Sequence, residues 1–148
     1  MRRRLDEYMA SAEFRALLQG QSPPTKPSWT IQIGDVDGDG HNDAAVELTF
    51  VPEEGNAVWY MGVLVWRNDG QRLVNAGRIP PPSLNGRQGN PSLKPMSDDG
   101  HIVIEEEYYQ EDDARCCPSM EGSSEYSLVG GKLARVDGTP PTVKDEGE

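Results

Sequence analysis

Residues 28–51 read SWTIQIGDVDGDGHNDAAVELTFV. The middle of this stretch holds four aspartates within nine residues: Asp35, Asp37, Asp39 and Asp43. Like charges at this density repel one another unless a multivalent cation lies among them. Ligands at positions one, three and five, followed by a glycine at position six, are typical of a calcium loop. Gly40 occupies that sixth position, where the chain must turn sharply.

The remaining ligands of such a loop follow from the same spacing. The backbone carbonyl of His41 would supply position seven, and Asp43 at position nine would close the shell. Position twelve, where an EF-hand has a bidentate glutamate, is Val46. We therefore expect Asp43 to replace that glutamate. The predicted metal ligands are Asp35, Asp37, Asp39, His41 and Asp43, and the predicted ion is Ca²⁺.

The flanks of the loop favour strands over the helices of an EF-hand. Residues 28–33 alternate and are rich in β-forming side chains. Downstream, Val46, Leu48 and Phe50 share one face of an alternating pattern. The pattern predicts a strand–loop–strand calcium site. The alternative is a solvated acidic turn without a metal, while Mg²⁺ and Zn²⁺ fit the donor set less well.

Residues 35–46 resemble the calcium loop of FG-GAP/VCBS-type repeats of extracellular proteins. That resemblance implies calcium binding by the four aspartates inside a β-hairpin. The loop occurs once, so a complete propeller is excluded within this chain. A second, weaker resemblance covers more of the chain. Strand–turn–strand segments are followed by the sequence CCPS at 116–119 and by residues 126–128 and 130–133, and this order is similar to that of small bacterial exported or lipoprotein-like domains of unknown function. This second likeness implies a compartment and a fold.

Length and composition indicate one loop-rich domain. The chain has 148 residues, 35% of them apolar, with 16 glycines and 12 prolines. The net charge of −11 disfavours binding to nucleic acid or anionic lipid. No apolar stretch is long enough for a membrane span. We expect a monomer whose partner is an unidentified protein or glycan.

The N-terminus and the loop bear on the compartment. Met1–Arg4 is basic like the start of a signal peptide, but Asp6 and Glu7 interrupt the apolar region that should follow. Either the chain is cytoplasmic, or its leader has been removed. A calcium loop favours the second reading, because resting cytosol holds too little calcium to fill a weak site. We expect a periplasmic, secreted or lipid-anchored protein.

The periodicity predicts a mainly β (α+β) fold, with an antiparallel meander sheet of six or seven strands and one N-terminal helix. The helix lies at 5–19 within an N-terminal unit of residues 1–20, and could pack on the sheet or bind a partner. A Pro-rich linker follows at 21–27. The single β-rich domain spans 28–136, and 137–148 is predicted to be a flexible tail.

Within the domain, 57–67 is predicted to be a central strand covered on both sides, because both of its faces are apolar. Asn68-Asp69-Gly70 predicts a hairpin turn leading into 72–79. Residues 80–96, rich in Pro, Gly and Asn, are predicted to form a long surface loop. Further strands are predicted at 101–110, 125–129 and 132–136.

Cys116 and Cys117 are adjacent, and they are the only cysteines. A vicinal disulfide, two free thiols or a bridge to another molecule are the alternatives, and Pro118 favours a turn that would permit the disulfide. The spacing is not the C-x-x-C of a redox catalyst.

We find no catalytic motif, and the pair Glu105 and Glu107 is typical of a solvated strand face. The sequence therefore predicts a non-enzymatic calcium-binding β-domain that serves as a binding or structural module. The alternative is an inhibitor or immunity-type protein that acts on a partner enzyme through an acidic face or the 80–96 loop. A hydrolase is a third hypothesis.

Overall fold

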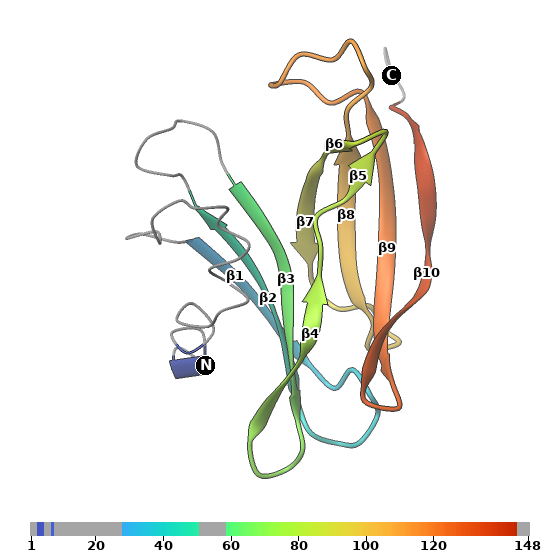
Figure 1. The fold of residues 1–148 in the computed structure, drawn as a ribbon. Coiled ribbons are helices and arrows are strands. Elements are labelled where there is room, and N and C mark those ends of the chain that lie inside the picture. The colour runs from blue at the N-terminus through green and yellow to red at the C-terminus, as the bar shows by residue number, and fades with distance from the viewer. Residues whose placement is uncertain (1–2, 5–6, 8–27, 51–58, 145–148) are drawn as a thin grey trace.

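The computed structural model describes residues 3, 4, 7, 28–50 and 59–144. These residues form two four-stranded antiparallel sheets and a two-stranded ribbon (Figure 1). The first sheet contains β1 (Ser28–Gly34), β2 (Asp43–Phe50), β3 (Trp59–Asn68) and β4 (Leu73–Ile79). The second contains β7 (Asn90–Lys94), β8 (Ile102–Tyr108), β9 (Met120–Val129) and β10 (Lys132–Val143). The ribbon pairs β5 (Ser83–Leu84) with β6 (Arg87–Gln88).

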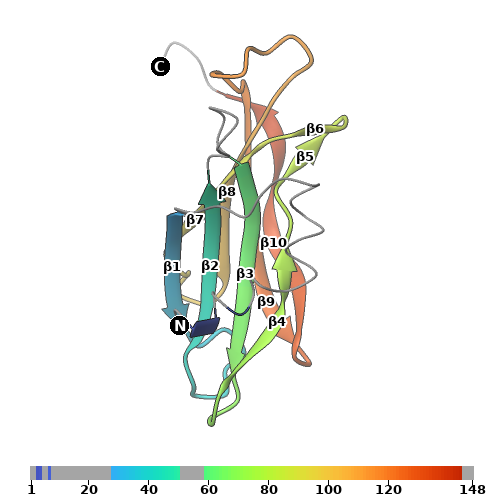
Figure 2. The same ribbon diagram turned by 60° about the vertical axis from the view of Figure 1, so that its left-hand side comes forward.

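Each sheet is a meander in which neighbours in sequence are neighbours in space. The two sheets face each other as a sandwich, with β4 beside β10 and β7 beside β1, β2 and β3 (Figures 1 and 2). The predicted mainly β, antiparallel meander architecture is confirmed. The strands form two packed sheets where the sequence suggested one. Among the described residues, no helix is long and apolar enough to cross a membrane.

The space between the sheets is filled by aliphatic side chains. Alternating residues of β2 and β3 point inward and meet alternating residues of β8 and β9. The buried members of this cluster are Val36, Ala45, Val63, Val65, Ile79, Leu93, Ile102, Ile104 and Leu128. Removing these side chains from water is the main driving force that holds the two sheets together.

A second buried cluster lies on the other face of the first sheet. It contains Val46, Leu48, Phe50, Met61, Leu64 and Trp66. The prediction that the third strand is covered on both sides is therefore confirmed. The alternation of β3 breaks at one point, because Met61 lies in the same cluster as Leu64 and Trp66. A register shift against β2 and a left-handed Gly62 (φ 89°) break the alternation there.

The prediction of a long surface loop at 80–96 is wrong. This stretch contains β5, β6 and β7. Asn85 and Gly86 both have positive φ, of 52° and 80°, as in the tight turns that close two-residue hairpins. Pro91 is tolerated because β7 is an edge strand, where a missing amide proton breaks no ladder on its open side.

The predicted tail at 137–148 is also wrong as far as Val143, because β10 continues to that residue. Pro140 and Pro141 fall where the register shifts between Thr139 and Thr142. A bulge on an edge strand accommodates prolines without breaking the sheet. The predicted N-terminal helix at 5–19 and the linker at 21–27 lie outside the residues that the structure describes, apart from Glu7.

Replacing Val65 by alanine should lower the free energy of unfolding by roughly 1.5–3 kcal/mol, since it removes two buried methyl groups and leaves a cavity. Val65 is fully buried between the sheets, whereas Val129 is 60% exposed. The same substitution at Val129 should change the stability by at most about 0.5 kcal/mol. Denaturant unfolding of both variants measures the difference. Equal losses would contradict the placement of Val65 in the inter-sheet core.

Candidate metal centre

The loop between β1 and β2 folds around the carboxylate of Asp35. Its Oδ1 accepts hydrogen bonds from the amides of Gly38 (2.8 Å) and Asp39 (3.2 Å), and its Oδ2 accepts one from the amide of Gly40 (2.8 Å). Gly38 and Gly40 adopt the left-handed conformation (φ 76° and 87°) that curls the chain back toward Asp35. The alternation of aspartate and glycine therefore creates the loop locally.

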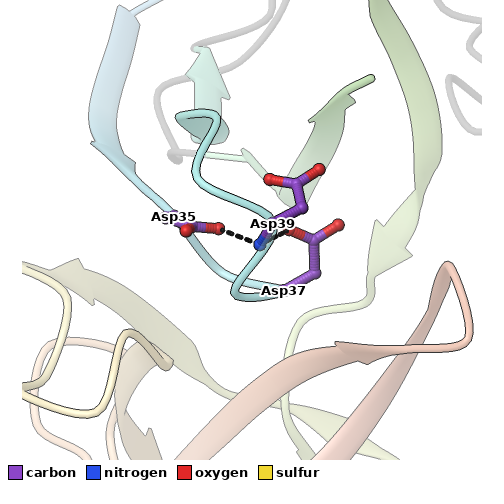
Figure 3. Close-up of side chains that lie close together, drawn as sticks. All are labelled: Asp35, Asp37 and Asp39. Carbon is purple, nitrogen blue, oxygen red and sulfur yellow. Dashed lines mark hydrogen bonds between the residues drawn. The ribbon is translucent and has the colours of Figure 1, made fainter. Parts of the chain in front are cut away.

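Asp37 and Asp39 complete a group of three carboxylates (Figure 3). One carboxylate oxygen from each of Asp35, Asp37 and Asp39 lies within 4.8 Å of the other two. Asp37 accepts a hydrogen bond from the Asp39 amide at 3.3 Å, and Asp39 accepts one from the His41 amide at 2.9 Å. The side chains at predicted ligand positions one, three and five are thus brought together.

Arg67, at the end of β3, reaches into this group. Its Nε donates to Asp37 Oδ2 at 2.7 Å, and its Nη2 lies 3.7 Å from Asp39 Oδ2. Burial alone would raise the pKa of Asp37, but the hydrogen bonds from Arg67 and the Asp39 amide outweigh it and hold that pKa below its ordinary value. The guanidinium supplies one positive charge to a loop with four carboxylates.

Asp43 has a different environment from the other three aspartates. It is fully buried, and its two oxygens accept hydrogen bonds from the amides of Val36 (2.8 Å) and Asn68 (2.7 Å). Burial raises the pKa of Asp43 despite these two bonds, and the charges of Asp37 and Asp39 add to the rise. Asp43 is not a member of the three-carboxylate group. It joins the start of the loop to the end of β3.

The loop is also attached to the second sheet. The side chain of Val36 is buried in the inter-sheet core. The hydroxyl of Ser127 on β9 donates to the Val36 carbonyl at 3.1 Å. The three-carboxylate group therefore projects from a segment that is fixed at Val36 to both layers of the sandwich.

The donor set suits calcium. Calcium takes six to eight oxygen ligands and tolerates irregular geometry, and each carboxylate offers about four lone-pair directions. The hydrogen bonds to Asp35, Asp37 and Asp39 leave acceptor capacity on each of them. The imidazole of His41 is exposed, and its ring lies beside Gly70, at the hairpin between β3 and β4. In the predicted site, His41 would bind the ion through its backbone carbonyl oxygen and not through its ring.

Spacing in the sequence identified Asp35, Asp37, Asp39 and Asp43, but it did not identify Arg67, Asn68 or Ser127. Arg67 lies next to the loop because β2 and β3 are antiparallel, with Ala44 opposite Trp66. Knowledge of that register would have placed Arg67 opposite Asp43. Ser127 carries no signal in the sequence, because it depends on how the two sheets stack.

Cys116 and Cys117 are bonded to each other in an exposed turn between β8 and β9, so the vicinal-disulfide alternative is the one found. The Cys117 amide donates to the Ala114 carbonyl at 2.9 Å and closes the turn. The hydroxyl of Tyr109 donates to the Arg115 carbonyl at 2.6 Å and holds the turn against the sheet.

The acidic residues of the second sheet border a separate open groove of about 1100 Å³. Glu105 lies 3.7 Å from Lys94, and Glu107 pairs with Lys144. Exposed ion pairs of this kind contribute little to stability. Their arrangement agrees with the solvated strand face that the sequence predicted for Glu105 and Glu107.

Comparison with protein-family models, with curated proteins and with solved structures finds no significant match. The likeness of residues 35–46 to FG-GAP/VCBS-type loops therefore stays a prediction. The function must be argued from the residues of this chain.

Replacing Asp43 by asparagine should lower the free energy of unfolding by roughly 1–3 kcal/mol in calcium-free buffer. The asparagine can accept one of the two amide hydrogen bonds, while its NH₂ group would face the other amide and leave a buried donor unsatisfied. Asp99 lies exposed in a turn, and Asp99→Asn is the matched control. Thermal unfolding with a chelator present compares the two variants. Equal stability would show that the bonds to Val36 and Asn68 do not hold the loop.

Proposed function

We propose that this protein is a calcium-stabilised β-sandwich that acts as a non-enzymatic binding or structural module outside the cytoplasm. The observation that carries the proposal is the grouping of Asp35, Asp37 and Asp39, with oxygens from all three within 4.8 Å of one another. The spacing also suggests the His41 carbonyl and Asp43 as ligands. Asp43, however, lies outside this group, and both of its oxygens accept hydrogen bonds from backbone amides.

The charge balance of the loop supports an attraction for a divalent cation. Arg67 offsets one of the four carboxylate charges and leaves three negative charges in a partly buried loop. A bound calcium ion would supply two positive charges and accept oxygen ligands without requiring a strict geometry. Hydrogen bonds from backbone amides stabilise Asp35 and Asp43, so the loop is organised before an ion binds.

Arg67 suggests a limit to the affinity. Its guanidinium already occupies one side of the carboxylate group, and an ion between Asp37 and Asp39 would have to displace or repel it. Competition between the guanidinium and the ion for the same carboxylates lowers the affinity of the site for the ion. A weak site fits the calcium concentrations of extracellular fluid or periplasm better than those of resting cytosol.

The expected consequence of binding is stabilisation of the whole domain. The loop joins β1 to β2 and reaches β3 through Asn68 and β9 through Ser127. An ion that binds only the folded loop adds about 2.7 kcal/mol at one hundred times its dissociation constant. This mechanism needs no catalytic residue, and it is consistent with a protein that acts as a binding or structural module.

Calcium chloride should raise the melting temperature of the protein, and chelation should lower it. Asp39→Asn should weaken calcium binding by about tenfold or more, since it removes one ligand charge and keeps the size of the side chain. Asp98→Asn, in an exposed turn, should leave binding unchanged. Isothermal titration calorimetry gives the affinities. If the native protein releases no heat with millimolar CaCl₂ and its melting temperature does not respond, the proposal is wrong.

Arg67→Gln should strengthen calcium binding, because it removes the positive charge that competes for Asp37 and Asp39. We expect the calcium affinity to increase by about three- to tenfold, because one nearby, partly exposed positive charge is removed. Arg72→Gln is the control, since the Arg72 side chain is largely exposed and lies 4.0 Å from Asp69, outside the three-carboxylate group. Unchanged or weaker calcium binding by the Arg67 variant would contradict competition between Arg67 and calcium. It would not contradict the calcium site itself, which the Asp39 variant tests.

A further inference from the structure

In the described part of the chain, the edge strands of the two four-stranded sheets differ in how they are protected against pairing with another strand. An edge strand exposes unpaired amides and carbonyls, and proteins protect such edges with charges, prolines or bulges. The edge strand β7 contains Pro91 and Lys94, and the carboxylate of Glu47 accepts a hydrogen bond from the Leu93 amide at 3.2 Å. The edge strand β10 contains two adjacent prolines and two register shifts.

The edge strand β4 has a comparable protection. Its register against β3 shifts between Val65 and Trp66, and it contains Arg78, whose Nη1 donates to the Met61 carbonyl at 2.9 Å. A shifted, charged strand presents a poor surface for an added strand. Three of the four edges of the two four-stranded sheets are thus protected by charges, prolines or register shifts.

The fourth edge, β1, has none of these devices. Its seven residues, SWTIQIG, include no charge and no proline, and its pairing with β2 shows no register shift. Ile31 and Ile33 are 41% and 64% exposed, although both are large apolar side chains. In the part of the chain that the structure describes, β2 is the only strand that pairs with β1 (Figure 2).

The sequence of β1 is complementary to itself. In an antiparallel pair related by a two-fold axis at Ile31, all seven residues of both strands are paired. Ile31 then lies opposite the Ile31 of a second copy, Trp29 opposite Ile33, and Thr30 opposite Gln32. Apolar residues meet apolar residues on one face, and polar residues meet polar residues on the other. Two-fold axes at neighbouring residues would leave the ends of the strand unpaired.

We infer that the edge of β1 facing away from β2 is a docking surface for a second copy of this chain, and that two first sheets join there into one continuous eight-stranded antiparallel sheet. The pair forms roughly six to eight main-chain hydrogen bonds, since every second residue of each strand exchanges two. It also covers the exposed Ile31 and Ile33 side chains through cross-strand contacts. This inference revises the monomer expected from the sequence, and it does not depend on the calcium proposal.

The net charge of each copy makes the association dependent on salt. Two chains of −11 repel one another, while β1 itself carries no charge that could pair with its partner. Added salt screens repulsion between separated charges. We therefore expect the dimer fraction to increase with sodium chloride, opposite to the behaviour of an interface built on ion pairs.

Sedimentation equilibrium of the full chain, at concentrations up to about 1 mM and at low and high salt, tests the inference. We expect a monomer–dimer equilibrium that Ile31→Lys weakens by at least about tenfold, because two lysines would face each other across the axis. Val74→Lys on β4 is the matched control, since Val74 is 40% exposed at the opposite edge of the same sheet. A thermal melt of each variant confirms that it is folded.

Cysteine cross-linking tests the register. The native cysteines are bonded to each other, so an introduced thiol is the only free one. Ile31→Cys should form a disulfide-linked dimer on mild oxidation, because directly opposite Cβ atoms lie about 4.5–5.5 Å apart. Ile33→Cys should not, since two copies of residue 33 would lie about 14 Å apart along the strands. A chain that stays monomeric at every concentration and salt, a dimer that Ile31→Lys leaves intact, or equal cross-linking of both variants would overturn the inference.

Discussion

Burial of β3 on both of its faces is the constraint on which the rest of the structure depends. Val63 and Val65 pack into the space between the sheets, while Leu64 and Trp66 pack on the opposite side. A strand that is apolar on both faces must lie inside a layered structure. Its last two residues, Arg67 and Asn68, are therefore held at a fixed place, where the acidic loop meets them.

The fold was predictable where local chemistry decides it. Asn68-Asp69-Gly70 lies at the hairpin connection between β3 and β4 that its sequence indicates, and the strand that leads into it alternates except at Gly62. The prediction failed at 80–96 and beyond Asp137, where prolines suggested loops. Proline is excluded from the interior of a sheet but not from an edge, and which strands are edges depends on the stacking of the whole chain.

The candidate site likewise has a part that the local sequence predicts and a part that depends on the folded chain. Asp35, Asp37 and Asp39 converge because two glycines curl residues 35–40 around the carboxylate of Asp35, and that information is local. The distinct position of Asp43 is not local, because its two hydrogen bonds reach Val36 and the far end of β3. A spacing rule assigns all four aspartates one role. The structure separates three that share a surface from one that is buried and bonded to amides.

The acidic loop and the free edge of β1 are physically connected. Among the strands that the structure describes, β1 is hydrogen-bonded to β2 alone, so its pairing with β2 and the loop that follows it hold it in the sheet. Strands held on one side only are among the first to open. The bonds of Asp43 to Val36 and Asn68 fix the end of β1 against the end of β3, and Val36 and Ser127 fix the same point to the second sheet. Whatever strengthens the loop must therefore also strengthen the strand whose edge is exposed.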